Sequence, residues 1–153
     1  MNLEEVRNLF CKTVADSLCL SGWEAHKQKC YKFSKEKKNW KESKQECEFL
    51  NSRLIIINTP EDQKFAEKFH KQYPCWIGLT DQENEGNWTW VDGTPLSFSQ
   101  WLDGEPNNAG DEDCAVLKSG RWNDRKCNYL FHFICQQRAL RCIKAAATDN
   151  VCF

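Results

Sequence analysis

The sequence predicts a single α+β domain that disulfides stabilise. Two segments place buried-type residues at helical spacing, and short apolar segments typical of strands flank them. A stretch rich in Gly, Asn, Asp and Pro, residues 80–110, indicates long loops before the last strands. The chain has 153 residues, which suits one domain with short extensions, and ten cysteines.

The cysteines indicate an oxidising, extracellular compartment. They are even in number and dispersed, and no tight CxxC pair typical of a zinc site occurs among them. The sequence has neither a signal-peptide pattern nor an apolar run long enough to span a membrane. Because a disulfide-rich chain must still be exported, we expect a fragment whose signal or membrane anchor lies upstream.

The charge gives no reason to expect a nucleic-acid partner, since the formal net charge is -1. Basic residues gather in "HKQKCYKFSKEKKNWKESK", residues 26–44. We interpret this segment as a solvated face, with a polyanion-binding patch as the alternative.

Residues 1–18 differ from the rest of the chain. Their pattern fits a short helix at the end of an oligomerising neck, or else a frayed tail. The residues that recur there in steps of three and four are Leu3, Val6, Phe10, Thr13 and Ser17.

Two amphipathic helices are expected after this segment. The first covers "NWKESKQECEFLN", residues 39–51, with helical spacing of Trp40, Ser43, Lys44, Cys47 and Leu50. The second covers "TPEDQKFAEKFHKQY", residues 59–73, which opens with Thr-Pro and acids and places Phe65 and Phe69 on one face.

The expected strands share alternating or continuous apolar residues. They are "KCYKFS" at 29–34, "SRLIIIN" at 52–58, "CWIGL" at 75–79, "DCAVLKSGRWND" at 113–124 and "FHFICQQ" at 131–137. Residues 139–153 come after the last strand, with two cysteines and little pattern.

The acidic segment "DGEPNNAGDEDC", residues 103–114, needs something that relieves its charge repulsion. Surface acids stay ionised at neutral pH, and no arginine lies within the segment, so a bound cation is the economical answer. The available ligands are carboxylate and amide oxygens, which favours calcium over magnesium; a solvated acidic loop is the alternative. The acids are Asp103, Glu105, Asp111, Glu112 and Asp113.

A second oxygen-rich segment, "RWNDRKC", sharpens this expectation. It places Asn123 and Asp124 just before Cys127. A disulfide from Cys127 to Cys114 would hold the two segments side by side. One ion could then be surrounded by Glu105, Asn107, Glu112, Asn123 and Asp124.

Four short motifs and one cysteine occur together in order: "WIGL" at 76–79, "EPN" at 105–107, "EDC" at 112–114, "WND" at 122–124 and Cys135. With these features the sequence resembles a C-type lectin-like domain over residues 19–138, and closely the mannose-type calcium-dependent lectins of type II myeloid and hepatic receptors. The resemblance implies two helices packed on two small antiparallel sheets, with long calcium-binding loops. It also divides the chain into a neck remnant at 1–18, the lectin domain and an extension at 139–153.

The resemblance implies two sets of calcium ligands. The principal calcium would take Glu105, Asn107, Glu112, Asn123 and both the side chain and backbone carbonyl of Asp124. The auxiliary calcium would take Asp81, Glu85, Asn108, Glu112 and Asp113. The bond before Pro106 is expected to be cis, which would turn the Glu105 and Asn107 oxygens toward one ion.

The implied activity is calcium-dependent binding of mannose, N-acetylglucosamine and fucose-type glycans. The equatorial 3- and 4-hydroxyls would complete the calcium shell, and the ligand side chains would also hydrogen-bond them. Glycans of glycoproteins or microbial surfaces are the expected partners of a secreted lectin or a type II receptor ectodomain, with oligomers formed through the neck. The alternative is a lectin-like domain that binds a protein, lipid or ice surface by another face.

The resemblance implies three disulfides, Cys19–Cys30, Cys47–Cys135 and Cys114–Cys127. Cys11, Cys75, Cys142 and Cys152 are left over, with Cys142–Cys152 as one guess and Cys11 as a link between chains. Cys75 departs from the family, which usually has an aromatic residue there.

Several further residues receive plainer interpretations. Arg125 and Lys126 are either ligand contacts or solvated charge, and the three histidines are too scattered for a site. Asn87 begins the glycosylation sequence "NWT", although a strand and a middle tryptophan disfavour its use. No nucleophile–base set, phosphate loop or zinc motif suggests an enzyme. Core positions are expected for most of Trp76, Trp88, Trp90, Trp101 and Trp122.

Overall fold

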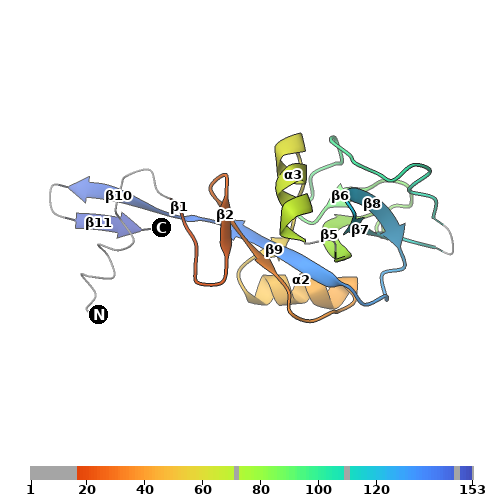
Figure 1. The fold of residues 1–153 in the computed structure, drawn as a ribbon, viewed down its shortest axis with the longest axis horizontal. Helices are drawn as coiled ribbons and strands as arrows, with labels where there is room; N and C mark the ends of the chain where they lie inside the picture. The colour runs from red at the N-terminus through yellow and green to blue at the C-terminus, as the bar shows by residue number, and fades with distance from the viewer. Residues whose placement is uncertain (1–16, 71–72, 109–110, 147–148, 153) are drawn as a thin grey trace. The chain divides into compact units, whose positions relative to one another are not determined.

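A computed structural model describes residues 17–70, 73–108, 111–146 and 149–152 (Figure 1). The chain forms two compact units. One combines Met1–Tyr31 with Gln137–Phe153, and the other is Lys32–Gln136. The second unit holds all the expected ligand residues.

Both expected helices form in the second unit. Helix α2 is Trp40–Phe49, and the side chain of Asn39 caps its start by accepting the Glu42 backbone N–H at 2.9 Å. Helix α3 is Pro60–Phe69, capped in the same way by Thr59. It ends before the expected Tyr73, because the chain turns at His70 and the backbone N–H of Tyr73 bonds to the carbonyl of His70.

The strands that lie wholly or partly in this unit form one continuous mixed sheet rather than two antiparallel ones. Their order is β3-β9-β5-β7-β8, with β4 on β9 and β6 on β5. The parallel pair β5–β9 joins the antiparallel neighbours on either side, and the α+β class is confirmed. The bounds are β3 Lys29–Phe33, β4 Arg53–Leu54, β5 Cys75–Thr80, β6 Thr89–Trp90, β7 Cys114–Lys118, β8 Arg121–Arg125 and β9 His132–Arg138.

The β7–β8 hairpin brings the two oxygen-rich segments together. Ser119 and Gly120 both have positive φ, +49° and +76°, which is the geometry of a tight two-residue hairpin turn. The resulting register sets Asp124 opposite Ala115 and Arg125 opposite Cys114. The WND segment therefore lies beside the strand that comes directly after the acidic loop.

An aromatic and aliphatic core lies beneath this hairpin. Trp76, Trp88, Trp90 and Trp122 are buried, as expected for core positions, whereas Trp101 is half-buried. The indole N–H of Trp122 donates to Gln63 of α3 at 2.9 Å, which satisfies its buried polar atom.

Within the expected strand 52–58, residues 54–57 are buried, yet only Arg53–Leu54 pairs as a strand. The backbone N–H of Ile56 donates to the side chain of Gln136 instead of to a strand carbonyl. This side-chain bond interrupts the regular ladder, so the segment stays extended without full strand pairing.

The first unit contains strands that the sequence did not indicate. Strands β1 Ser17–Leu18, β10 Leu140–Ala146 and β11 Asp149–Cys152 form a sheet in the order β1-β10-β11, and β2 Glu24–His26 pairs with β3. The register sets Cys142 opposite Cys152, so their expected pairing stays a prediction that the backbone accommodates. Apart from β1, the neck expected over 1–18 lies outside the described residues, and the three-part division of the chain stays a prediction.

Three disulfides are present, Cys19–Cys30, Cys47–Cys135 and Cys114–Cys127. These are the pairs that the resemblance implies. Cys75 is a buried free thiol, and burial raises its pKa well above the ordinary value. Neither helix of the described residues is long and apolar enough to cross a bilayer.

The two disulfides of the second unit should differ in their contribution to stability. Cys47 and Cys135 are separated by 88 residues, and Cys114 and Cys127 by 13. On the chain-entropy model, replacing the first pair by alanine should lower the free energy of unfolding by about 4–5 kcal/mol, and the second by about 3 kcal/mol. Urea unfolding of both variants in a chelator measures the difference, and a larger loss for the shorter loop would contradict it.

Candidate functional site

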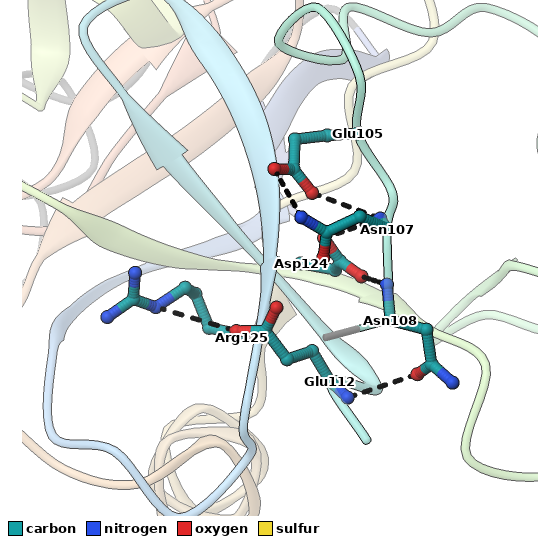
Figure 2. Close-up of polar contacts among 6 residues, drawn as sticks. All are labelled: Glu105, Asn107, Asn108, Glu112, Asp124 and Arg125. Carbon is teal, nitrogen blue, oxygen red and sulfur yellow. Dashed lines mark hydrogen bonds and ion pairs between the residues drawn. The ribbon is translucent and has the colours of Figure 1, made fainter. Parts of the chain in front are cut away.

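The carboxylate of Asp124 organises the acidic loop. Asp124 lies on β8 with 0% of its surface exposed. Its two oxygens accept the backbone N–H groups of Asn107 at 3.2 Å and of Asn108 at 2.7 Å (Figure 2). A buried carboxylate requires such donors, because burial without them is costly. The loop is therefore fastened to the β7–β8 hairpin.

Glu105 and Asn107 face one another on either side of Pro106. The Asn107 side-chain amide donates to one carboxylate oxygen of Glu105 at 3.0 Å, and the Asn107 backbone N–H donates to the other at 3.0 Å (Figure 2). The Glu105-Pro106 peptide bond is cis, as the resemblance implies. One carboxylate and one carboxamide are thus presented together beside Asp124.

Glu112 completes this group from the far end of the loop. Its backbone N–H donates to the side chain of Asn108 at 3.1 Å, and its carboxylate lies 4.0 Å from Nε of Arg125 (Figure 2). The guanidinium carbon of Arg125 lies 5.0 Å from the ring centroid of Tyr129 and 5.9 Å from that of Phe131. These cation–π contacts hold the arginine beside the acids.

Asn123 contributes a side-chain oxygen that is an unsatisfied hydrogen-bond acceptor. Its side-chain carbonyl is buried and has no hydrogen-bond partner among the residues that the structure describes. Buried polar atoms are nearly always paired, so an unpaired one calls for an explanation such as an ion. Asn123 precedes Asp124 on β8, which places this oxygen in the same segment as the site.

A second acidic cluster lies where β5 meets β7. Asp81, Glu85 and Asp113 each offer a carboxylate oxygen, and these oxygens all lie within 4.8 Å of one another. The Asp81 backbone N–H donates to the carbonyl of Asp113 at 3.1 Å, and Gly86 donates to the Asp81 carboxylate at 2.9 Å. One carboxylate oxygen of Asp81 and one of Asp113 are buried without a partner among the described residues.

The electrostatics of both clusters favour a cation. The neighbouring Asp124 carboxyl, followed by desolvation, raises the pKa of Glu105 to about 7. Desolvation and the charges of Asp81 and Asp113 raise the pKa of Glu85 to about 7. Desolvation also raises the pKa of Asp81 and of Glu112, the latter with a further contribution from Asp124. A divalent cation would relieve this repulsion.

The donor set therefore fits calcium. It consists of carboxylate and amide oxygens, three of which are buried and unpaired, and calcium accepts oxygen ligands in irregular geometry. Of the expected principal ligands, Glu105 and Asp124 are joined by hydrogen bonds from Asn107. Of the expected auxiliary ligands, Asp81, Glu85 and Asp113 cluster. Asn108 and Glu112 bond to each other instead.

Sequence reasoning left the role of Arg125 open, and it missed the rings that hold it. Tyr129 and Phe131 lie four and six residues after Arg125, a spacing that carries no recognised pattern. Only the path of the chain after Cys127 brings the three side chains together.

Comparison with known proteins identifies a family and relatives of this chain. A family model described as "Lectin C-type domain" matches residues 36–137. The chain is 45% identical over 123 residues to mouse CD209 antigen-like protein D, which covers 78% of this chain and 52% of that protein. It is 45% identical over 119 residues to chicken hepatic lectin, covering 75% of this chain and 58% of that protein. The chain thus spans little more than half of these curated relatives.

A solved structure agrees with the sequence matches. The carbohydrate-recognition domain of cow CD23, crystallised in the presence of a GlcNAc2Man3 oligosaccharide, superposes with a TM-score of 0.78 at 38% identity. The alignment covers 81% of this chain and 98% of that one.

The raised pKa of Glu105 predicts a pH-dependent difference between two metal-free proteins. The pKa is about 7 in the folded state and 4.5 ordinarily, so ionisation destabilises the fold as the pH rises through this window. In a chelator, Glu105→Gln should be more stable than the wild type at pH 8, and this advantage should shrink toward pH 5. Urea titrations of both proteins at each pH measure the difference in their free energies of unfolding. Both proteins contain the same histidines, so the contribution of histidine titration cancels in this difference. A pH-independent difference would contradict the prediction.

Proposed function

This chain belongs to the C-type lectin domain family, a family of non-enzymatic carbohydrate-binding domains, and on that premise we propose that it binds mannose-type glycans through calcium. The observation that carries the proposal is the bonding of Asp124 to the Asn107 and Asn108 amides. It holds the EPN segment beside the WND segment. The proposed principal ligands are Glu105, Asn107, Glu112, Asn123 and Asp124.

A bound calcium would supply coordination positions for two vicinal sugar hydroxyls. The residues around it would orient the sugar. The Glu105 carboxylate accepts and the Asn107 amide donates, and at present they satisfy each other at 3.0 Å. When a sugar binds, Glu105 and Asn107 can give up this mutual bond and hydrogen-bond one sugar hydroxyl instead. Glu112 would accept from the second hydroxyl and Asn123 would donate to it. This order favours the equatorial 3- and 4-hydroxyls of mannose, N-acetylglucosamine and a similar pair in fucose.

The second cluster is proposed as the auxiliary calcium site. Its unpaired carboxylate oxygens on Asp81 and Asp113 support this assignment. Asn108 and Glu112 are the remaining proposed ligands, and their mutual hydrogen bond would have to open for both to reach the ion. Because Glu112 belongs to both proposed sets, the two ions would be coupled through it.

The setting proposed for this domain is extracellular, as a secreted lectin or a receptor ectodomain of the type II kind. Three disulfides support an oxidising compartment. A single sugar buries little area, so the affinity for a monosaccharide should be on the order of millimolar, about -4 kcal/mol. Useful binding to glycoproteins or microbial surfaces would then require clustered copies, which an N-terminal neck would supply.

Retention on mannose-agarose in calcium, followed by elution with a chelator, tests the proposal. Asn107→Asp should abolish retention, because it replaces the donor that faces the hydroxyl by a second acceptor. Asn58→Asp, an exposed position before α3, makes the same chemical change away from the site and should be retained. Calcium binding is measured separately by tryptophan fluorescence.

Flow-through of a calcium-loaded wild type would contradict sugar binding of this type. It would favour the alternative, a lectin-like domain that binds a non-sugar ligand by another face.

Removing the charge of Arg125 should strengthen calcium binding. The guanidinium lies beside Glu112, a proposed ligand, and a positive charge there opposes the ion. Because Arg125 is partly exposed, we expect a modest gain for Arg125→Gln, about two- to fivefold, corresponding to about 0.5–1 kcal/mol. Arg125→Lys keeps the charge and should bind calcium like the wild type. Arg121→Gln is the matched charge control on the same strand, and an equal gain there would contradict a local effect.

A further inference from the structure

Residues 87–89 read Asn-Trp-Thr, and this is the only Asn-x-Ser/Thr sequence in the chain. We propose that Asn87 carries an N-linked oligosaccharide. The sequence disfavours this because of an expected strand and the tryptophan in the middle position. In the structure Asn87 and Trp88 precede β6, which begins at Thr89, so the acceptor asparagine itself lies outside the strand.

The local geometry presents Asn87 to solvent. Asn87 ends the loop after β5, where its backbone N–H closes a turn on the carbonyl of Asn84 at 2.9 Å. Burial then alternates along the chain, with Asn87 exposed, Trp88 buried, Thr89 half-buried and Trp90 buried. The acceptor asparagine is therefore open to solvent, whereas the half-buried threonine turns its hydroxyl toward the Thr80 carbonyl.

Trp88 anchors the tripeptide without obstructing its outer side. Its ring packs edge-on against Trp101, with centroids 5.0 Å apart, and its backbone carbonyl accepts the N–H of Leu96 at 3.3 Å. The middle residue is thus turned into the core, while Asn87 beside it is exposed. A glycan on Asn87 would therefore extend away from the packed indoles.

The disulfides supply a second, independent observation. Their formation requires the oxidising secretory compartment, which is also where N-linked oligosaccharides are transferred. In the transfer, the side-chain nitrogen of Asn87 forms a bond to the anomeric carbon of an oligosaccharide on a lipid diphosphate. The bond from that carbon to the diphosphate breaks, the lipid diphosphate leaves, and the amide loses one proton.

The fold also sets when the transfer must occur. In the folded protein Thr89 is paired with Thr80 on β5 and bridges to Pro95, and its hydroxyl lies 3.5 Å from the Thr80 carbonyl. The tripeptide is then no longer free to bind a transferase in extended form. Transfer therefore precedes the packing of β6 on β5, and competition with folding leaves part of the chains unmodified. Once the domain has folded, the exposed Asn87 accommodates the glycan.

The glycan would stand next to the second acidic cluster. Asn87 lies two residues after Glu85, on the loop that also carries Asp81. It belongs to neither proposed ligand set. Its substitution is therefore expected to leave retention on mannose-agarose unchanged, so the failure of this inference and the failure of the proposed function can be distinguished.

Secretion from cultured eukaryotic cells, followed by treatment with a peptide N-glycosidase, tests the proposal. The wild type should show a slower band that collapses onto the faster one after treatment, and peptide mass spectrometry should locate the sugar on Asn87. Asn87→Gln and Thr89→Ala should show only the faster band. Thr89→Ser keeps the acceptor sequence and should keep the slower band, as should Asn84→Gln, which changes the same loop outside the motif.

Two outcomes would overturn the proposal. One is a wild-type protein whose mobility the glycosidase does not change. The other is an equal mobility change in the wild type and Asn87→Gln, which would place the glycan elsewhere. Thr89→Ser and Asn84→Gln guard against misfolding, since each alters the loop while the motif persists.

Discussion

The carboxylate of Asp124 is fully buried on β8, and it receives the backbone N–H groups of two consecutive residues of the acidic loop. Charge-assisted bonds of this kind are among the stronger ones, and an unpartnered buried carboxylate would be costly. If the loop moved away from β8, the Asp124 carboxylate would either become exposed to water or stay buried without hydrogen-bond donors. Its attachment places Glu105 and Asn107 in mutual contact, and it sets the Asn108 side chain that positions Glu112.

The parts of the fold that local chemistry determines could be predicted from the sequence. The helices form where helical spacing and the Thr-Pro start predict them, and the apolar "CWIGL" segment becomes a fully buried central strand. Long-range pairings escaped prediction. The segment 139–153 shows little pattern, yet within it strands Leu140–Ala146 and Asp149–Cys152 pair antiparallel through backbone bonds. The parallel pairing of β5 with β9 depends on where the chain travels between them.

The candidate site divides along the same line. Its acids and amides could be identified because like charges at close spacing require a counter-charge, whatever the fold. The contacts of Arg125 with Tyr129 and Phe131 could not, because cation–π partners are set by the path of the backbone. The hydrogen bond between Glu112 and the Asn108 side chain also could not be predicted, because composition does not give the geometry of the loop.

Charge repulsion is confined to the loops of the site, and the packed core beneath them keeps the domain folded. The raised pKa values of Glu85 and Glu105 show that the loops carry unfavourable charge density, while the strands beneath them are packed with fully buried Trp76, Trp122 and Leu117. The Cys114–Cys127 disulfide closes the base of the acidic region, and Cys47–Cys135 ties α2 to β9 outside it. The core and the disulfides therefore supply the stability of the domain. Repulsion among the carboxylates of the loops offsets part of it. A cation acting on these loops would change their order and their affinity for ligands far more than it would change the fold that holds them.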